Sequence, residues 1–342
     1  MTFGRLDDIL RRMKSVRVGV LGDFCLDAYW DMDESDEVSI ETGLLTRSVV
    51  GQRYAPGGAG NVAANLASLG CQVSAFGIVG NDLFGTELVR ILNGLGITHQ
   101  GILRQANTWE TAVYAKPHTG RKELGRIDFG RRNAMTTTLA GALGDLLRES
   151  LSGLDALVIN QQLKEGLWSG PFPASMSALL AAGVPCPVVC DVRSDSLRFP
   201  GVIMKMNEAE AVRRTGLPDH PAVETASVLH RQSGMPVFVT CGKEGIVVSD
   251  GTVTHIPAVR TTGPLDTVGA GDTAVAAIAG SIAAGASTRE AAMCATVAAG
   301  VTISKIGRTG TASPAEVVRC AAHHPMLSDA PAGDGQEQPG AA

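Results

Sequence analysis

Short apolar runs alternate along most of this chain with segments of helical periodicity that end in glycine. The runs lie at 17–22, 71–80, 156–160, 187–192, 202–207, 236–242 and 245–250. Between them stand segments such as ANLASLG, DLFGTELVRILNGLG, SMSALLAAG and ETASVLHRQSG. Strands that are apolar throughout are buried on both faces, and strands that alternate with helices form parallel sheets. The sequence therefore predicts an α/β fold, a doubly wound and mostly parallel sheet with helices on both faces.

Two regions depart from this alternation. Residues 28–55 and 107–132 contain alternating segments with few long apolar runs, such as TWETAVYAKP. They predict a small inserted sheet with one solvated face, placed so that it could act as a lid over a site. We expect residues 1–326 to form one domain and the polar tail 327–342 to be disordered.

Charge and cysteine content exclude several classes of protein. The 29 Lys and Arg against 34 Asp and Glu give a net charge of −5, and no long basic run suggests a nucleic-acid partner. The first sixteen residues resemble a short amphipathic helix rather than a secretion signal, and the apolar stretch 273–286 is too short to span a bilayer. We expect a cytoplasmic protein with no membrane contact. The seven cysteines predict no disulfide framework, and no histidine pair has zinc-binding spacing.

The strongest site signal lies within 261–286. The turn Gly269-Ala270-Gly271 leads into Asp272 and a long run of small residues, which predicts a helix beginning at the turn. Helix N-termini carry unpaired N–H groups and partial positive charge, so such a turn suits a phosphate. Asp272 could instead be a simple N-cap. The second acidic residue, Asp266, and the two glycines favour the anion site.

A second glycine-rich loop spans 56–70, with Gly57, Gly58 and Asn61. The pattern G-x-G-x-x-A beginning at Gly58 could indicate a dinucleotide site, but we see no strand directly before it, and QRYAPG stands there instead. We therefore interpret the loop as backbone lying against a small polar ligand, with Asn61 offering a donor and an acceptor.

The remaining candidates have a structural interpretation of equal or greater weight. Asp23 and Asp27 follow a strand, where carboxylates can accept bonds from sugar hydroxyls, although Asp23 alone fits a turn or cap. Asn207 and Glu210 match a capping box at a strand-to-helix junction. Thr240, Gly242 and Gly245 fit an ordinary hairpin turn between two strands.

Together and in this order, the segments resemble the ribokinase-like (PfkB) family of sugar and nucleoside kinases. DTVGAGD matches the family signature without a gap, and the early Gly-Gly loop, N-x-x-E and T-x-G-x-x-G also match. The resemblance implies ATP and Mg²⁺, with Asp272 as general base and the amides of Gly269, Ala270 and Gly271 as an anion hole. It further implies a small-molecule sugar or sugar-phosphate substrate and a homodimer formed through the lid. The implied ligand contacts are Asn207 and Glu210 for Mg²⁺ through water, Thr240, Gly242, Gly245, Ala299 and Gly300 for the nucleotide, Asp27, Gly57, Gly58 and Asn61 for the acceptor, and Asp266 with the loop 307–311 for K⁺.

Within the family, the segments GDFCLDAYW, PGGAGNVAANLASLG, GRIDF and DVRSDSLRFPG resemble the heptose-phosphate kinase, which occurs alone or fused to an adenylyltransferase. This resemblance makes Arg126, Lys164 and Arg193 candidates for contacts to a phosphate on the acceptor, with ordinary surface charge as the alternative. Two segments depart from the subgroup: INQQLKEG replaces a Ser-Asp-Tyr run, and 41–53 lacks the Pro-rich lid pattern. A kinase of another sugar or nucleoside, and a non-catalytic sugar- or nucleotide-binding relative, stay open.

Overall fold

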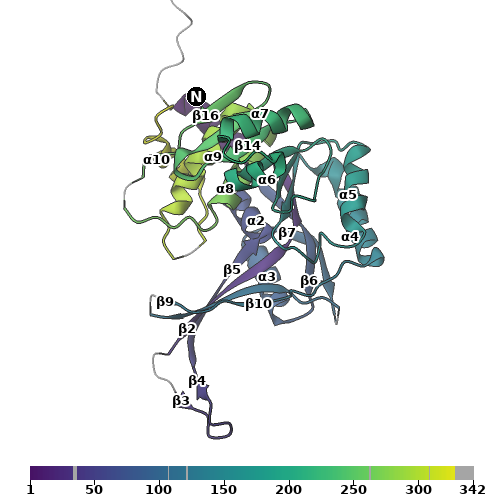
Figure 1. Cartoon of the computed structure of the whole chain (residues 1–342), viewed down its shortest axis with the longest axis vertical. Coiled ribbons are helices and arrows are strands. Elements are labelled where there is room, and N and C mark those ends of the chain that lie inside the picture. Colours follow the sequence, from purple (N-terminus) through teal and green to yellow (C-terminus); the bar gives the residue numbers. More distant parts are fainter. Residues whose placement is uncertain (34–36, 107, 121, 262, 308, 328–342) are drawn as a thin grey trace, which may run out of the picture.

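The main sheet of the computed structural model contains nine strands in the order β16-β15-β14-β13-β12-β11-β1-β6-β7 (Figure 1). The model describes residues 1–327 apart from 34–36, 107, 121, 262 and 308, so the predicted disorder of the tail falls almost entirely outside the described residues. Neighbouring strands run parallel from β7 to β14, and β15 and β16 complete an antiparallel edge. The strands are β1 (Arg17–Gly22), β6 (Gln72–Gly80), β7 (Thr98–Gln105), β11 (Ala156–Gln161), β12 (Val188–Val192), β13 (Ile203–Asn207), β14 (Val237–Thr240), β15 (Ile246–Ser249) and β16 (Val253–Ile256).

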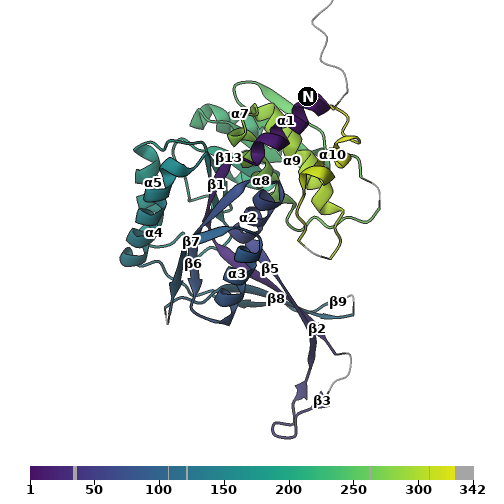
Figure 2. The same ribbon diagram turned by 180° about the vertical axis from the view of Figure 1, so that it is seen from behind.

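Helices cover both faces of this sheet, which confirms the predicted doubly wound α/β class. Alternate residues of the strands point to opposite sides, so that Val189 packs in one apolar cluster and Cys190 in another. The first face carries α1 (Phe3–Met13), α2 (Ala59–Ser68), α3 (Leu83–Gly94), α8 (Ala270–Ala283), α9 (Thr288–Ile303) and α10 (Pro314–Ala321) (Figure 2). The second face carries α4 (Thr137–Ser150), α5 (Phe172–Ala181), α6 (Glu208–Thr215) and α7 (Ala222–Ser233).

A smaller sheet extends from the body in both views (Figures 1 and 2). Its strands follow the order β10-β8-β2-β5, with β2 antiparallel to β5 and parallel to β8. A short hairpin projects from its far end. The bounds are β2 (Phe24–Met32), β5 (Val49–Gly58), β8 (Ala112–Thr119), β9 (Lys122–Glu123) and β10 (Ile127–Phe129), with β3 (Glu37–Val38) and β4 (Leu45–Thr46) in the hairpin.

One argument made from the sequence is wrong. We expected no strand directly before the Gly58 loop, yet β5 runs straight into α2. The end of this strand was missed because β5 is mostly exposed or half-buried and belongs to the smaller sheet, not to the buried parallel one. A strand in that sheet, antiparallel to its neighbour β2, does not supply the parallel βαβ unit that a dinucleotide site requires.

Two further properties concern cysteines and membranes. All seven cysteines are unpaired, and all but Cys320 are buried. In the part of the chain that the structure describes, no helix is both long enough and apolar enough to cross a bilayer.

Candidate active site

Helix α8 begins without a side-chain cap. Its N-cap, Gly269, has φ 81° and ψ −2°, in the left-handed region that favours glycine. The Ala270 N–H donates to the Thr267 carbonyl at 3.2 Å, whereas we find no acceptor for the Gly271 and Asp272 N–H groups among the described residues. Donors left open at a helix N-terminus can bind an anion. Of the three amides predicted to form an anion hole, that of Ala270 is thus already engaged.

The Asp272 carboxylate lies in the first turn of α8 and accepts two side-chain hydrogen bonds. Asn61 Nδ2 donates to Oδ2 at 2.7 Å, and Gln162 Nε2 donates to Oδ1 at 3.3 Å. Burial raises the pKa of Asp272 to about 6, although the hydrogen bond from Asn61 acts in the opposite direction. A carboxylate with a pKa near neutrality is suited to accept a proton from a substrate.

A buried chain of hydrogen bonds orients the Asn61 amide. Thr273 Oγ1 donates to Asn65 Oδ1 at 2.9 Å, and Asn65 Nδ2 donates to Asn61 Oδ1 at 3.2 Å. Because the Asn61 oxygen is occupied as an acceptor, its NH₂ group faces Asp272. Asn61 was predicted to contact the acceptor; the structure also brings it against the Asp272 carboxylate.

An ion pair that the sequence did not suggest lies beneath the start of α8. Lys205 Nζ on β13 is 3.1 Å from Asp191 Oδ2 on β12, and both residues are buried. A Cβ atom at Gly271 would stand 3.1 Å from the Lys205 ammonium, so glycine lets the cation approach the helix terminus. Lys205 lowers the pKa of Asp272 and Asp191 raises it. A lone Lys in an apolar strand pattern carries no signal of this role.

The predicted acceptor residues meet a second cation. Asp27, inside strand β2, forms an ion pair with Lys116 of β8 at 3.2 Å, and both side chains are largely buried. Burial raises the pKa of Asp27, and Lys116 opposes that shift. A Cβ atom at Gly57 would lie 3.4 Å from this carboxylate, and Thr309 Oγ1 lies 3.4 Å from the Tyr29 hydroxyl. Lys116 and Tyr29 were not predicted.

The segment that departs from the heptose-phosphate kinase pattern makes internal bonds. Asp23 Oδ2 accepts from the N–H groups of Gln162 and Leu163 at 2.8 and 2.9 Å, which fits the structural interpretation of Asp23. Gln161 is buried, donates to the Leu163 carbonyl and accepts from Ser194 N–H. The Asn160 amide is fully buried with no hydrogen-bond partner among the described residues. Gln162 alone of these side chains reaches Asp272.

Asn207 and Glu210 form the capping box that the sequence indicated. Asn207 Oδ1 accepts from Glu210 N–H at 2.9 Å, and Glu210 Oε2 accepts from Asn207 N–H at 2.8 Å. Glu210 Oε1 is left for another partner. Among the residues with described positions, no three His, Cys, Asp or Glu side chains gather as metal ligands. The arrangement fits a hydrated Mg²⁺ held through water, which needs few protein ligands.

The predicted nucleotide residues fall into two groups. Thr240 pairs with Asn207 in the sheet register, and the turn from Gly242 to Gly245 connects β14 and β15, so the predicted hairpin is confirmed. At Gly245 and Gly300, close packing within the protein also explains why glycine is present. A Cβ at Gly245 would lie 2.1 Å from the Ile256 carbonyl, and one at Gly300 would lie 3.2 Å from Cys320 Sγ. Ala299, next to Gly300 on α9, is partly exposed.

Asp266 joins two loops. Its carboxylate accepts from Val268 N–H at 3.1 Å and from Gly307 N–H at 3.0 Å. The loop 307–311, the predicted neighbour of a K⁺ site, is thereby held against the turn before α8, although position 308 lies outside the described residues.

The three basic candidates differ in their surroundings. Arg126 pairs with Asp128 at 2.7 Å and stacks over Tyr114 with its guanidinium carbon 4.4 Å from the ring centre. Arg193 is exposed, and its charge lowers the pKa of both Asp23 and Asp272. Lys164 is exposed, and we find no contact between it and the other predicted site residues in the described ranges. The charges of Arg193 and Arg126 therefore act on carboxylates of the site, that of Arg193 on Asp23 and Asp272 and that of Arg126 on Asp27, and the role of Lys164 stays a prediction.

Comparison with known proteins defines the class. The model of the pfkB family of carbohydrate kinases matches residues 34–316. The chain therefore belongs to the pfkB family, as its motifs indicated, and is a carbohydrate kinase. Bifunctional protein HldE of Geobacter metallireducens is 30% identical over 92% of this chain and 64% of its own length. That of Gluconobacter oxydans is 31% identical over 89% of this chain and 64% of its own length. The chain spans less than two thirds of these relatives.

Solved structures share the fold at lower identity. Phosphofructokinase-2 from Escherichia coli, crystallised with substrates and products, has a TM-score of 0.72 and 20% identity over 90% of this chain and 99% of its own. Ribokinase from Arabidopsis thaliana, complexed with ribose and ATP, has a TM-score of 0.67 and 19% identity over 90% and 99%. These matches confirm the ribokinase-like fold.

Proposed function

We propose that this enzyme transfers the γ-phosphoryl group of ATP to a hydroxyl of a sugar phosphate, with a heptose 7-phosphate as acceptor. The observation that carries the proposal is the Asp272 carboxylate, with a pKa of about 6, in the first turn of a helix that begins with open N–H groups. A base and an anion site are thus side by side, which phosphoryl transfer requires.

In the proposed reaction, Asp272 accepts the proton of the acceptor hydroxyl as its oxygen attacks the γ-phosphorus, and ADP leaves with the bridging oxygen. The amides of Gly269 and Gly271 stabilise the transferring group, with the Lys205 ammonium close behind them. Asn61 and Gln162 hold the carboxylate in place through the two hydrogen bonds described above. At pH 7 most of Asp272 is ionised and ready to act as a base.

ATP would lie along the edge formed by Thr240, Gly242, Ala299 and Gly300, bound largely by main chain. A Mg²⁺ ion held at this edge would supply positive charge against the charge that develops on the phosphates. Glu210 Oε1, left open by the capping box, offers it a carboxylate through water. For K⁺, Asp266 would contribute lone pairs beyond those that the Val268 and Gly307 amides use.

The acceptor assignment rests on the heptose-phosphate kinase resemblance and on the matches to proteins named HldE. The Asp27 carboxylate beside Gly57 would accept sugar hydroxyls, and Lys116, Arg126 and Arg193 supply positive charge for a phosphate. The segment INQQLKEG stands where the subgroup has a Ser-Asp-Tyr run. This difference is weak evidence against a heptose 7-phosphate, because the Gln161 side chain is buried and hydrogen-bonded within the protein. Lys164, exposed two positions after Gln162, is a further candidate for this phosphate.

We further propose a cytoplasmic homodimer formed through the smaller sheet, which would act as a lid. Exposed apolar side chains gather on the projecting hairpin and the start of β5: Val38, Ile40, Leu44, Leu45 and Val50. Such a patch suits contact with a second copy. Sedimentation of Leu45→Glu beside the wild type tests this: a shift from dimer to monomer is expected, and a wild-type monomer contradicts the proposal.

An ADP-release assay tests the reaction with heptose 7-phosphate, fructose 6-phosphate, ribose and adenosine as acceptors. We expect the largest kcat/KM with heptose 7-phosphate. Faster turnover of another acceptor would overturn the heptose assignment and leave the kinase mechanism. If the wild type binds ATP and yet releases ADP no faster than Asp272→Asn with every acceptor, that result would favour a non-catalytic sugar- or nucleotide-binding relative.

A further inference from the structure

A cavity of about 490 Å³ opens on the face of the main sheet opposite α8. Among the described parallel crossovers, the one from β12 to β13 is made by the loop 193–202 without a helix. The sheet is therefore uncovered between the cluster around α5 and that around α6 and α7. The strands form its floor with Cys190, Met204 and Met206.

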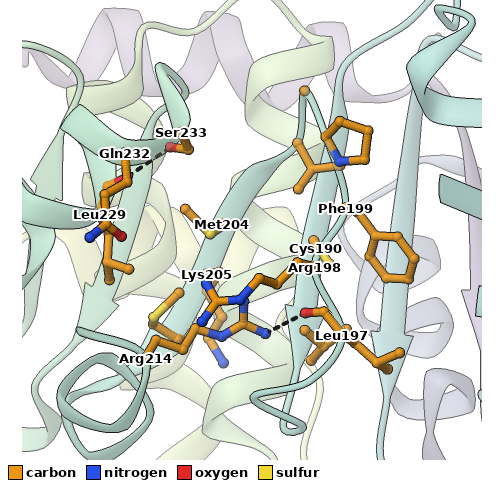
Figure 3. A pocket seen from close by; sticks show the side chains of 15 residues that line it. Cys190, Leu197, Arg198, Phe199, Met204, Lys205, Arg214, Leu229, Gln232 and Ser233 are labelled. Atoms are coloured by element: carbon orange, nitrogen blue, oxygen red, sulfur yellow. Dashed lines mark hydrogen bonds between the residues drawn. The ribbon is translucent and has the colours of Figure 1, made fainter. Parts of the chain in front are cut away.

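The walls are mainly apolar, and two guanidinium groups reach into the space (Figure 3). Leu197, Phe199 and Leu229 supply hydrocarbon surface. Arg214, on α6, is 9% exposed, and its Nη2 donates to the Ser194 and Leu197 carbonyls at 3.0 Å. For Nε and Nη1 we find no acceptor in the described ranges. Arg198, at the rim, likewise has no carboxylate partner there.

Two neighbouring guanidinium groups, neither in an ion pair with a carboxylate of the described residues, indicate the charge of a ligand. Burial and the charge of Arg198 lower the pKa of Arg214, while the charges of Cys190, Asp195 and Glu210 oppose this shift, and a guanidinium stays protonated in proteins. A carboxylate or phosphate would satisfy the open Arg214 donors in a charge-assisted pair. The cavity volume is in the usual range for small-molecule sites, and its walls suit an apolar body.

The floor of the cavity shares its strands with the active site. Cys190 precedes Asp191 on β12, and Met204 and Met206 flank Lys205 on β13. Because successive strand residues point to opposite faces, the cavity lies directly behind the Asp191–Lys205 pair under α8. The loop 193–202 also carries Arg193, a proposed acceptor contact.

We propose that this cavity binds a small organic anion with an apolar body, a carboxylate or a phosphate monoester, and that occupancy alters the kinase reaction through β12 and β13. The site goes beyond the proposed function, and its binding test needs no turnover. Failure of one can therefore be told from failure of the other.

Calorimetric titration with octanoate, octyl phosphate, octanol and octylammonium tests the head group. We expect saturable binding of octanoate, octyl phosphate or both, and at least tenfold weaker binding of octanol and octylammonium. The tighter of the two anions identifies the head group. The proposal would be overturned if octanol or octylammonium bound as tightly as both anions. It would also be overturned if neither anion gave saturable binding.

Variants locate the site. Arg198→Gln should weaken binding of the preferred anion about tenfold, whereas Arg231→Gln, an exposed change on α7 outside the cavity, should leave it unchanged. Arg214→Lys keeps the charge but loses the fork and should also weaken binding. Wild-type affinity for the preferred anion in both Arg198→Gln and Arg214→Lys would contradict the site. At saturation we expect kcat or the KM for ATP to change at least twofold, and unchanged kinetics would refute the coupling.

Discussion

Helices α6 and α8 begin in opposite ways. At α6, Asn207 and Glu210 bond each other's backbone, so side chains satisfy two donors at this terminus, the N–H groups of Asn207 and Glu210. At α8, the N-cap is a left-handed glycine with no side-chain bond. With glycine as the N-cap, the missing side-chain bond costs roughly a few tenths of a kcal/mol of stability. The difference teaches that a capping box engages two donors at the start of α6 and leaves one Glu210 oxygen over, whereas the Gly271 and Asp272 N–H groups at the start of α8 stay open, as the proposed anion site requires.

The largest expected effect comes from the acidic residue at the open terminus. Asp272→Asn should lower kcat by about 10²- to 10⁴-fold, because the positioned base is lost, while ATP binding is retained. Turnover and calorimetric ATP binding measure the two effects. Asp145→Asn, an exposed change on α4, serves as control. Near wild-type turnover in Asp272→Asn would remove the base assignment and with it the functional contrast between the two helices.

A matched pair of glycines tests the shape of the open terminus. Gly269 and Gly216 both have positive φ, but only at Gly269 would a Cβ meet atoms, Thr309 Cγ2 at 2.7 Å and Asn61 Nδ2 at 2.9 Å. Alanine should cost about 1–2 kcal/mol of unfolding free energy at Gly216, where only the left-handed backbone opposes it, and more at Gly269, where the close contacts add to that cost. Gly269→Ala should also lower kcat by about tenfold or more, since Asn61 holds Asp272. Equal kcat in both variants would contradict the role of the turn.

At the start of α6, two roles of Glu210 can be tested separately, its bond in the capping box and its proposed contact to Mg²⁺. Glu210→Gln preserves a capping box, since Gln can replace Glu there, but removes the charge. We expect little change in thermal midpoint and a roughly tenfold higher Mg²⁺ requirement. Asn207→Ala should instead lower the unfolding free energy by about 1 kcal/mol. An unchanged Mg²⁺ requirement in Glu210→Gln would make this terminus purely structural.

The smallest expected effect is that of pH. Because burial raises the pKa of Asp272 to about 6, the base is protonated as pH falls, and kcat/KM should drop about fourfold between pH 8 and pH 5.5. The pKa of Asp272 in the folded state lies above the usual 3.8. Between pH 3.8 and about 6, the unfolded state therefore binds fewer protons at this residue than the folded state does. The contribution of Asp272 to stability is therefore favourable at low pH and is lost as pH rises through 6. Chemical unfolding of the wild type and of Asp272→Asn at several pH values measures this contribution. If the unfolding free energies of the two proteins change with pH in parallel, the raised pKa of Asp272 is contradicted.

Edge elements were the hardest part of the fold to predict. The seven expected apolar runs became β1, β6 and β11 to β15, with ends differing by at most a few residues. Strands β7 and β16 were missed, because edge strands are half exposed and lack a continuous apolar run. The same cause hid the end of β5 before Gly58, although strands were expected within 28–55.

In the site, residues of one local motif were predictable and their distant partners were not. Asp272 with its glycine turn, and Asn207 with Glu210, stand within a few positions of each other, so spacing alone indicated their arrangement. Lys116, Lys205 and Tyr29 carry no such pattern. Lys164 and Arg193 look equivalent in the sequence, and only the tertiary structure shows that the charge of Arg193 acts on Asp272.

The sequence by itself determined the α/β class, the family and the start of α8, because periodicity, capping and glycine turns act over short stretches of chain. Only the tertiary structure decided what surrounds Asp272. Asn61 and Gln162 reach it across separations of 211 and 110 residues, and Lys205 and Asp191 come from neighbouring strands beneath it. Burial by these elements raises its pKa, and burial is a property of packing that no local pattern records.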